Sequence, residues 1–176
     1  MSIPVTPKQA AFVTSLEGAV ASPYYDSVGV LTWGVGHTAA AGAPDPSTLP
    51  DNSDQPLERV FSVFMKDLQR YADEVDRAIA VRLTEAERGA AISFHYNTGA
   101  IGRATWVRHL NEGRKDRAIA SIMNWGRPPE IIPRRQRERD LLANGDWGNL
   151  KATLYTARNR RVQWGSARRR PEMPPT

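Results

Sequence analysis

Two carboxylic acids and a hydroxyl lie close together near the start of this chain of 176 residues. Asp26 follows Glu17 by nine positions, and Thr32 follows Asp26 by six. One carboxylic acid can protonate a leaving oxygen, while a second carboxylate acts as base or nucleophile. A hydroxyl beside them can hold the attacking water. These residue types at this spacing could hydrolyse a glycosidic bond.

A simpler interpretation competes with this one, because two acids nine positions apart are common in proteins. Glu17 would then be a solvated residue at a helix end, and Asp26 a solvated residue in a turn. The segment that follows, Thr32-Trp33-Gly34-Val35-Gly36-His37, favours the functional interpretation. Its glycines allow backbone shapes that other residues resist.

A helix followed by a hairpin must position these residues. Thr6 is suited to the N-cap and Gln9 completes a capping box, so a helix is expected from Pro7 onward. Gly18 is a good helix stop, which puts Glu17 in the last turn. Residues 22–37 read as two short strands around a turn at 27–29.

The remainder of the chain predicts a mainly helical α+β protein. Apolar residues at a spacing of three to four predict a long helix over about 56–81. A capping box at Thr84 opens a helix that runs to about 96. Residues 39–54 are rich in Ala, Gly, Pro, Asp and Ser and predict a surface loop. Three shorter helices are expected over 104–112, 115–124 and 134–143.

Composition narrows the classes of protein that need to be considered. There are no cysteines, so disulfides, cysteine nucleophiles and Cys-ligated zinc are excluded. No apolar run is long enough for a transmembrane helix, and the N-terminus lacks the apolar core of a signal peptide. The net charge of +5 favours an anionic partner: nucleic acid, a membrane surface or an acidic wall polymer. No nucleic-acid-binding motif is found, so specific nucleic-acid binding rests on charge alone.

The stretch from Glu17 to His37 resembles the signature of the phage-type lysozymes, glycoside hydrolase family 24. That signature is Glu, eight residues, Asp, five residues, Thr, and then Gly-x-Gly-His. Further matches follow in the family's order, and together they extend the resemblance over about residues 8–147. They are Ile92-Ser93-Phe94-His95-Tyr96-Asn97-Thr98-Gly99, Leu110-Asn111-Glu112-Gly113, Trp125, and Ile132-Pro133-Arg134-Arg135-Gln136-Arg137-Glu138-Arg139.

The resemblance implies a muramidase, here a phage endolysin that lyses the host cell. Such an enzyme hydrolyses the β-1,4 bond between N-acetylmuramic acid and N-acetylglucosamine in peptidoglycan and uses no cofactor or metal. Carried over, Glu17 is the general acid, Asp26 is the second carboxylate, and Thr32 helps to hold the water. Because the family is regarded as inverting, the two carboxyl groups are expected roughly 6.5–9.5 Å apart.

Further roles follow from the resemblance. It implies that His37 is structural and pairs with Asp67, and that Thr38 and Tyr96 lie near the sugar-binding cleft. A core position is an equal alternative for Tyr96. Arg135 either reaches the cleft and touches Glu17 or is one of many solvated arginines on a basic helix.

The resemblance also implies a two-lobed lysozyme fold over residues 1–147. A small lobe with the hairpin covers about 18–56, the long helix over about 56–81 connects it, and a helical lobe covers about 82–147. Residues 148–176 form a basic extension outside the resemblance, expected as a helix with a flexible tail. Its arginines could contact anionic lipopolysaccharide or membrane lipid, or could simply be solvated.

Two alternatives to a hydrolase remain open. A lysozyme fold could bind peptidoglycan or a partner without cutting it, and a lytic transglycosylase needs an acid but no water-activating carboxylate. The presence of both Asp26 and Thr32 weighs against each. We expect a monomer that stays in the host cytoplasm until a pore made by another protein, a holin, releases it to the periplasm.

Overall fold

The computed structural model describes residues 2–169, which divide into two compact units. One unit takes the residues up to Val13 together with Leu68–Asn149. The other takes Thr14–Asp67 together with the residues from Leu150 onward. The long helix α2, Leu57–Ala78, begins in the second unit and ends in the first. The predicted α+β class with a long connecting helix is confirmed.

Helix α1, Pro7–Glu17, begins and ends where the sequence predicts. The backbone N–H of Gln9 donates to Thr6 Oγ1 at 3.2 Å, and the N–H of Thr6 donates to Gln9 Oε1 at 3.1 Å. These two bonds form the predicted capping box. Gly18 ends the helix with a φ of +73°, a left-handed conformation that favours glycine.

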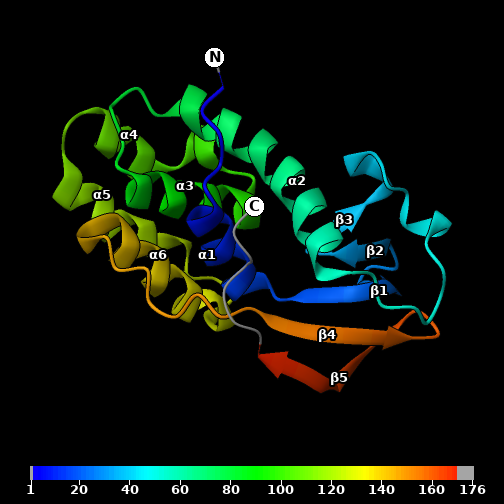
Figure 1. Ribbon diagram of the computed structural model, residues 1–176. Coiled ribbons are helices and arrows are strands. Elements are labelled where there is room, and N and C mark those ends of the chain that lie inside the picture. Colours follow the sequence, from blue (N-terminus) through cyan, green and yellow to red (C-terminus); the bar gives the residue numbers. More distant parts are fainter. Residues whose placement is uncertain (1, 170–176) are drawn as a thin grey trace. The chain divides into compact units, whose positions relative to one another are not determined.

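A single sheet organises the unit that contains Glu17 (Figure 1). Among the described residues its strand order is β3-β2-β1-β4-β5. The strands are β1 Ala19–Tyr25, β2 Leu31–Gly34, β3 His37–Thr38, β4 Thr153–Arg158 and β5 Arg161–Arg169. Strand β1 pairs antiparallel with β2 and parallel with β4. The predicted N-terminal hairpin is therefore the first part of a larger sheet.

The predicted C-terminal helix is wrong, because strands β4 and β5 form a hairpin there. The segment is rich in β-branched and aromatic residues, which pack well on a pleated surface. A two-residue turn at Asn159–Arg160 joins the strands, and β4 adds to β1. Trp164, on β5, leaves 72% of its surface exposed. The predicted flexible tail falls largely on residues 170–176, which lie outside the described part of the chain.

The helices of the other unit match their predicted positions to within a few residues. They are α3 Glu85–Thr98, α4 Thr105–Asn111, α5 Lys115–Ser121 and α6 Ile132–Asn144. Helix α3 begins with the predicted capping box between Thr84 and Glu87. Its centre is fully buried, and Phe94 packs edge-on against Trp106 and Trp125.

Short 3-10 turns complete the chain. They are η1 Ala39–Ala41, η2 Pro46–Thr48, η3 Ile101–Arg103, η4 Ile122–Trp125 and η5 Pro129–Ile131. The first two lie in the predicted surface loop over 39–54, where most side chains are exposed and Leu49 is buried. Within residues 2–169, none of the helices has the length and apolar character needed to cross a membrane.

Candidate active site

Glu17 occupies the last position of α1 and is exposed. The N–H of Gly18 donates to the carbonyl of Thr14 at 2.8 Å, which closes the final turn of the helix. Strand β1 then begins at Ala19. Only Gly18 separates the helix from the strand, so Glu17 lies where α1 meets the sheet.

Asp26 lies in the turn that joins β1 to β2. Its Oδ1 atom accepts the N–H of Val28 at 2.9 Å and the N–H of Val30 at 2.8 Å. The backbone closes the same turn, since the N–H of Asp26 donates to the carbonyl of Val30 at 3.0 Å. The carboxyl group is therefore fixed in direction by the turn to which it belongs.

Thr32 lies on β2, the strand between β1 and β3 in the sheet. It pairs with Tyr24 on β1 and with Thr38 on β3. The hydroxyl of Thr32 donates to the carbonyl of Val30 at 3.0 Å. A hydroxyl that donates in this way keeps lone pairs with which it can accept a hydrogen bond from water. The sheet thus brings Thr38 next to Thr32, as a shared site requires.

Tyr24 is a residue that the sequence reasoning missed. Burial raises the pKa of its hydroxyl, and the charges of Asp26 and Glu17 raise that pKa further. Both acids therefore lie within electrostatic reach of the same phenol. The aromatic pair Tyr24-Tyr25 was visible in the sequence, but the register that pairs Tyr24 with Thr32 was not.

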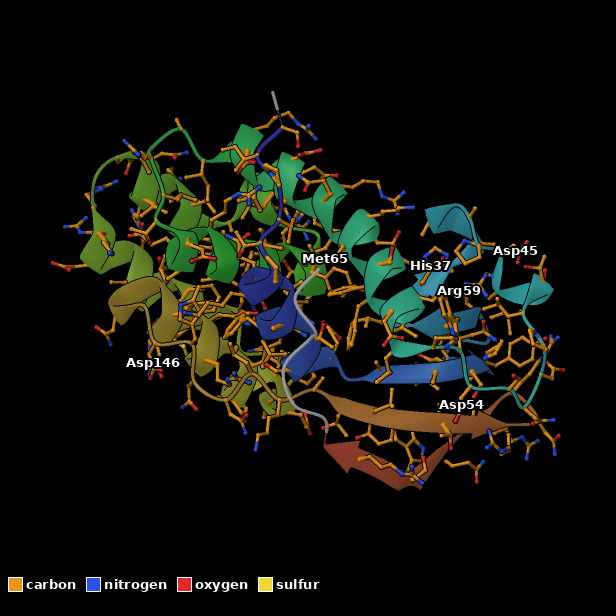
Figure 2. The ribbon with its side chains drawn as sticks, viewed as in Figure 1. His37, Asp45, Asp54, Arg59, Met65 and Asp146 are labelled. Atoms are coloured by element: carbon orange, nitrogen blue, oxygen red, sulfur yellow. The ribbon has the colours of Figure 1, made fainter. Side chains whose placement is uncertain are left out.

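His37 forms the predicted pair with Asp67. Its Nδ1 atom lies 2.6 Å from Oδ2 of Asp67, and its Nε2 atom lies 2.9 Å from the carbonyl oxygen of Pro44. Both side chains are buried. Figure 2 labels His37 at the β3 edge of the sheet. The ring connects α2, β3 and the loop over 39–54, and these contacts agree with the predicted structural role of His37.

Arg135 belongs to the other unit and is fully buried. Its guanidinium bonds Glu138 and Asn97 and lies 5.1 Å from the ring centre of Phe94. The interpretation of Arg135 as a solvated arginine is therefore wrong. Burial raises the pKa of Glu138, and the charges of Arg135 and Arg134 oppose that rise. Whether Arg135 touches Glu17 stays a prediction.

Tyr96, also in that unit, is partly exposed at the end of α3. Its ring lies 4.9 Å from the ring of Tyr71, which in turn contacts His95 at 5.4 Å. The Nε2 atom of His95 lies 2.7 Å from Glu74. Tyr96 therefore packs on one side while keeping accessible surface, so a role in sugar binding stays a prediction.

The sheet unit therefore holds two carboxyl groups, a hydroxyl and a phenol around one hairpin. The family model for phage lysozyme matches residues 14–138, a range that includes this hairpin. The chain belongs to the phage lysozyme family. The prediction of a lysozyme, a glycoside hydrolase of the phage endolysin type that acts on peptidoglycan, is confirmed by this membership.

Relatives of this lysozyme include the endolysin of Salmonella phage P22. It is 32% identical over 131 residues, which cover 71% of this chain and 88% of the relative. The SAR-endolysin of bacteriophage PS119 is 33% identical over 140 residues, covering 76% of this chain and 78% of the relative. The family model covers the hairpin with Asp26 and Thr32 and ends at residue 138, before β4 and β5.

Solved structures share the fold of this lysozyme. An endolysin from Escherichia coli O157:H7 phage FAHEc1 superposes with a TM-score of 0.74 at 21% identity, covering 85% of this chain and 99% of that one. A mutant of P22 lysozyme superposes with a TM-score of 0.70 at 26% identity, covering 80% of this chain and 98% of that one.

Proposed function

We propose that this lysozyme hydrolyses the β-1,4 bond between N-acetylmuramic acid and N-acetylglucosamine through Glu17, Asp26 and Thr32. The observation that carries the proposal is the single hairpin unit in which these groups occur. Glu17 ends α1, Asp26 occupies the β1–β2 turn, and Thr32 follows on β2. Both acids raise the pKa of Tyr24, which supports their acting on one reaction centre.

The proposed reaction has one displacement step. The carboxylic acid of Glu17 donates its proton to the glycosidic oxygen as the bond from that oxygen to the anomeric carbon breaks. A water molecule attacks the anomeric carbon from the opposite face of the sugar and gives its proton to Asp26. Thr32, whose hydroxyl donates to the carbonyl of Val30, accepts a hydrogen bond from that water. The products are two sugar chain ends, one of them reducing.

Stereochemistry tests the role of Asp26. A base needs room for water, so we expect carboxyl groups roughly 6.5–9.5 Å apart and inversion at the anomeric carbon. Proton NMR of the first products from defined peptidoglycan fragments should show the α-anomer before mutarotation. An initial β-anomer would instead identify Asp26 as a nucleophile. Mass spectrometry should find reducing ends, whereas anhydro-sugars would identify a lytic transglycosylase.

Thr38 and Tyr96 are proposed to bind the sugar chain. Thr38 is held next to Thr32 by the pairing of β2 with β3, and the buried pair of His37 and Asp67 fixes the start of β3. Arg135 is proposed to interact with Glu17. Variants at Thr38 and Tyr96 should raise KM for long peptidoglycan fragments with little change in folding stability.

Contact with an anionic surface is a separate part of the proposal. The exposed arginines of the C-terminal hairpin lie on strands β4 and β5, and β5 also exposes Trp164, a combination suited to lipopolysaccharide or acidic lipid. They are Arg158, Arg161 and Arg168. Co-sedimentation with vesicles containing phosphatidylglycerol should decrease when these residues become glutamine, and should decrease with salt. Equal binding by the wild type and the triple variant would contradict this contact.

We also propose that the enzyme acts as a monomer and reaches the wall through a pore made by another protein. Cell fractionation before and after co-expression of a holin tests the second claim. The enzyme should move from the cytoplasmic to the periplasmic fraction only when the pore is present.

A further inference from the structure

The C-terminal hairpin contacts strand β1 beside Glu17. Ala19 pairs with Leu154 in the parallel ladder between β1 and β4. A Cβ atom on Gly18 would lie 3.2 Å from the carbonyl oxygen of Thr153 and 3.3 Å from the ring of Tyr155. The residue that follows Glu17 is therefore packed directly against β4.

The same hairpin contacts the other end of β1, beside Asp26. The N–H of Tyr25 donates to the carbonyl oxygen of Arg160 at 2.9 Å. The Nη1 atom of Arg160 donates to the hydroxyl of Tyr25 at 3.1 Å, and its guanidinium lies 5.7 Å from the ring centre. Its Nε atom donates to Asp51 Oδ1 at 2.9 Å. Tyr25, which directly precedes Asp26, is thus held through both its backbone and its side chain.

The backbone of Arg160 has an unusual conformation for this residue type. Asn159 and Arg160 form the two-residue turn between β4 and β5, with φ values of 49° and 58°. A turn in which both central residues have positive φ strongly favours glycine at the second position. Arginine there is locally unfavourable, and such a residue persists where the surrounding structure compensates for it. Here the compensation comes from Tyr25 and Asp51.

We propose that Arg160 is a positioning residue for the hydrolysis. Its guanidinium bonds Tyr25 and Asp51 together, and this fixes the end of β1 from which the Asp26 turn begins. The inference rests on the proposed roles of Glu17 and Asp26. It extends the catalytic unit beyond residues 14–138 of the family match, because Arg160 lies on the C-terminal hairpin.

Replacement by glycine separates this role from a purely structural one. The variant Arg160→Gly removes the contacts of the guanidinium and at the same time gives the turn its favoured residue. We expect kcat on soluble peptidoglycan fragments to fall about tenfold, because small displacements of catalytic groups slow reactions strongly. KM and the melting temperature should stay near the wild-type values. Tyr25→Phe should lower kcat in the same direction, and the double variant should lower it no further than Arg160→Gly alone.

Two controls complete the experiment. Asn159→Gly changes the neighbouring position of the same turn, and Arg82→Ala removes an exposed arginine elsewhere; both should keep the wild-type kcat. A wild-type kcat in Arg160→Gly, or an equal loss in Asn159→Gly, would overturn the role of Arg160. Glu17→Gln measured alongside separates the two claims. If it is inactive while Arg160→Gly is fully active, only the role of Arg160 fails; if it is fully active, the proposed function itself fails.

Discussion

The Nδ1 atom of His37 lies 2.6 Å from Oδ2 of Asp67, and both side chains are buried. The other ring nitrogen, Nε2, lies 2.9 Å from the carbonyl oxygen of Pro44. One ring thus joins the long helix to β3 and to the loop that follows it. The Gly-x-Gly-His segment therefore ends in a residue that links the sheet to the long helix.

Removing the carboxylate from this pair should destabilise the fold. Asp67→Asn replaces an acceptor of the buried imidazole, and we expect a loss of about 1–3 kcal/mol in the free energy of unfolding. Urea unfolding followed by circular dichroism measures it. The exposed Asp116→Asn is the matched control and should leave the midpoint unchanged. An unchanged midpoint in Asp67→Asn would contradict a structural role for the pair.

Gly18 should tolerate no side chain. Its φ of +73° disfavours other residues, and a Cβ atom would also approach Thr153 and Tyr155 closely. We expect Gly18→Ala to lower the free energy of unfolding by about 1–2 kcal/mol from the backbone conformation alone, with a further loss from crowding. Gly113→Ala is the control, since its φ is +72° and its Cβ would have open space. Equal losses in the two variants would show that crowding at Gly18 has no effect.

Tyr24 should make the stability of the protein sensitive to high pH. Burial and the charges of Asp26 and Glu17 raise its pKa above the ordinary value of 10.0. The folded state therefore holds the phenolic proton more tightly than the unfolded state does. This contribution is fully present below the unfolded pKa and is lost as the pH rises through the folded pKa.

Thermal unfolding of the wild type and Tyr24→Phe from pH 8 to pH 11 measures this effect. The melting temperature of the wild type should fall more steeply above about pH 10 than that of the variant, since 10 is the ordinary tyrosine pKa. Other tyrosines and lysines titrate in both proteins, so the difference between the two curves reports Tyr24. Parallel curves would contradict the raised pKa.

Arg135 should matter for stability and for activity. Its buried guanidinium pairs with Glu138, and removing one partner of a buried pair commonly costs about 3–5 kcal/mol. We therefore expect strong destabilisation in Arg135→Ala and little in the exposed Arg82→Ala. Arg135→Lys keeps the charge but not the planar fork, and should lower kcat at temperatures where the variant is folded. A full kcat in Arg135→Lys would contradict a need for the planar guanidinium in the proposed interaction with Glu17.

The helices and the N-terminal hairpin could be predicted because their signals are local. The capping boxes at Thr6 and Thr84 lie within four residues of sequence, and the structure forms both. The C-terminal hairpin could not be predicted in this way, because β4 pairs with β1, which lies more than 130 positions earlier in the sequence. Apolar residues in that segment were therefore assigned to a helix.

The candidate site residues also divide into those that local sequence predicts and those that depend on contacts between distant segments. The roles of Glu17, Asp26 and Thr32 are predictions from their spacing and from the resemblance, whereas Tyr24 was missed because its place depends on strand register. A shift between Val20 and Tyr24 sets that register, and nothing in the local sequence reveals it. The burial of Arg135 was equally hidden, since it depends on Glu138 and Asn97 being in reach to accept its hydrogen bonds.

The most direct test of the account is the lysis of permeabilised Gram-negative cells by Glu17→Gln. The substitution keeps the size of the side chain and removes its proton-donating acid. Turbidity should fall with the wild type, and the rate with Glu17→Gln should be lower by a factor on the order of a hundred or more, as expected for loss of a general acid. The exposed Glu58→Gln should lyse cells at the wild-type rate. Equal rates of lysis by Glu17→Gln and the wild type would contradict the assignment of Glu17 as the catalytic acid.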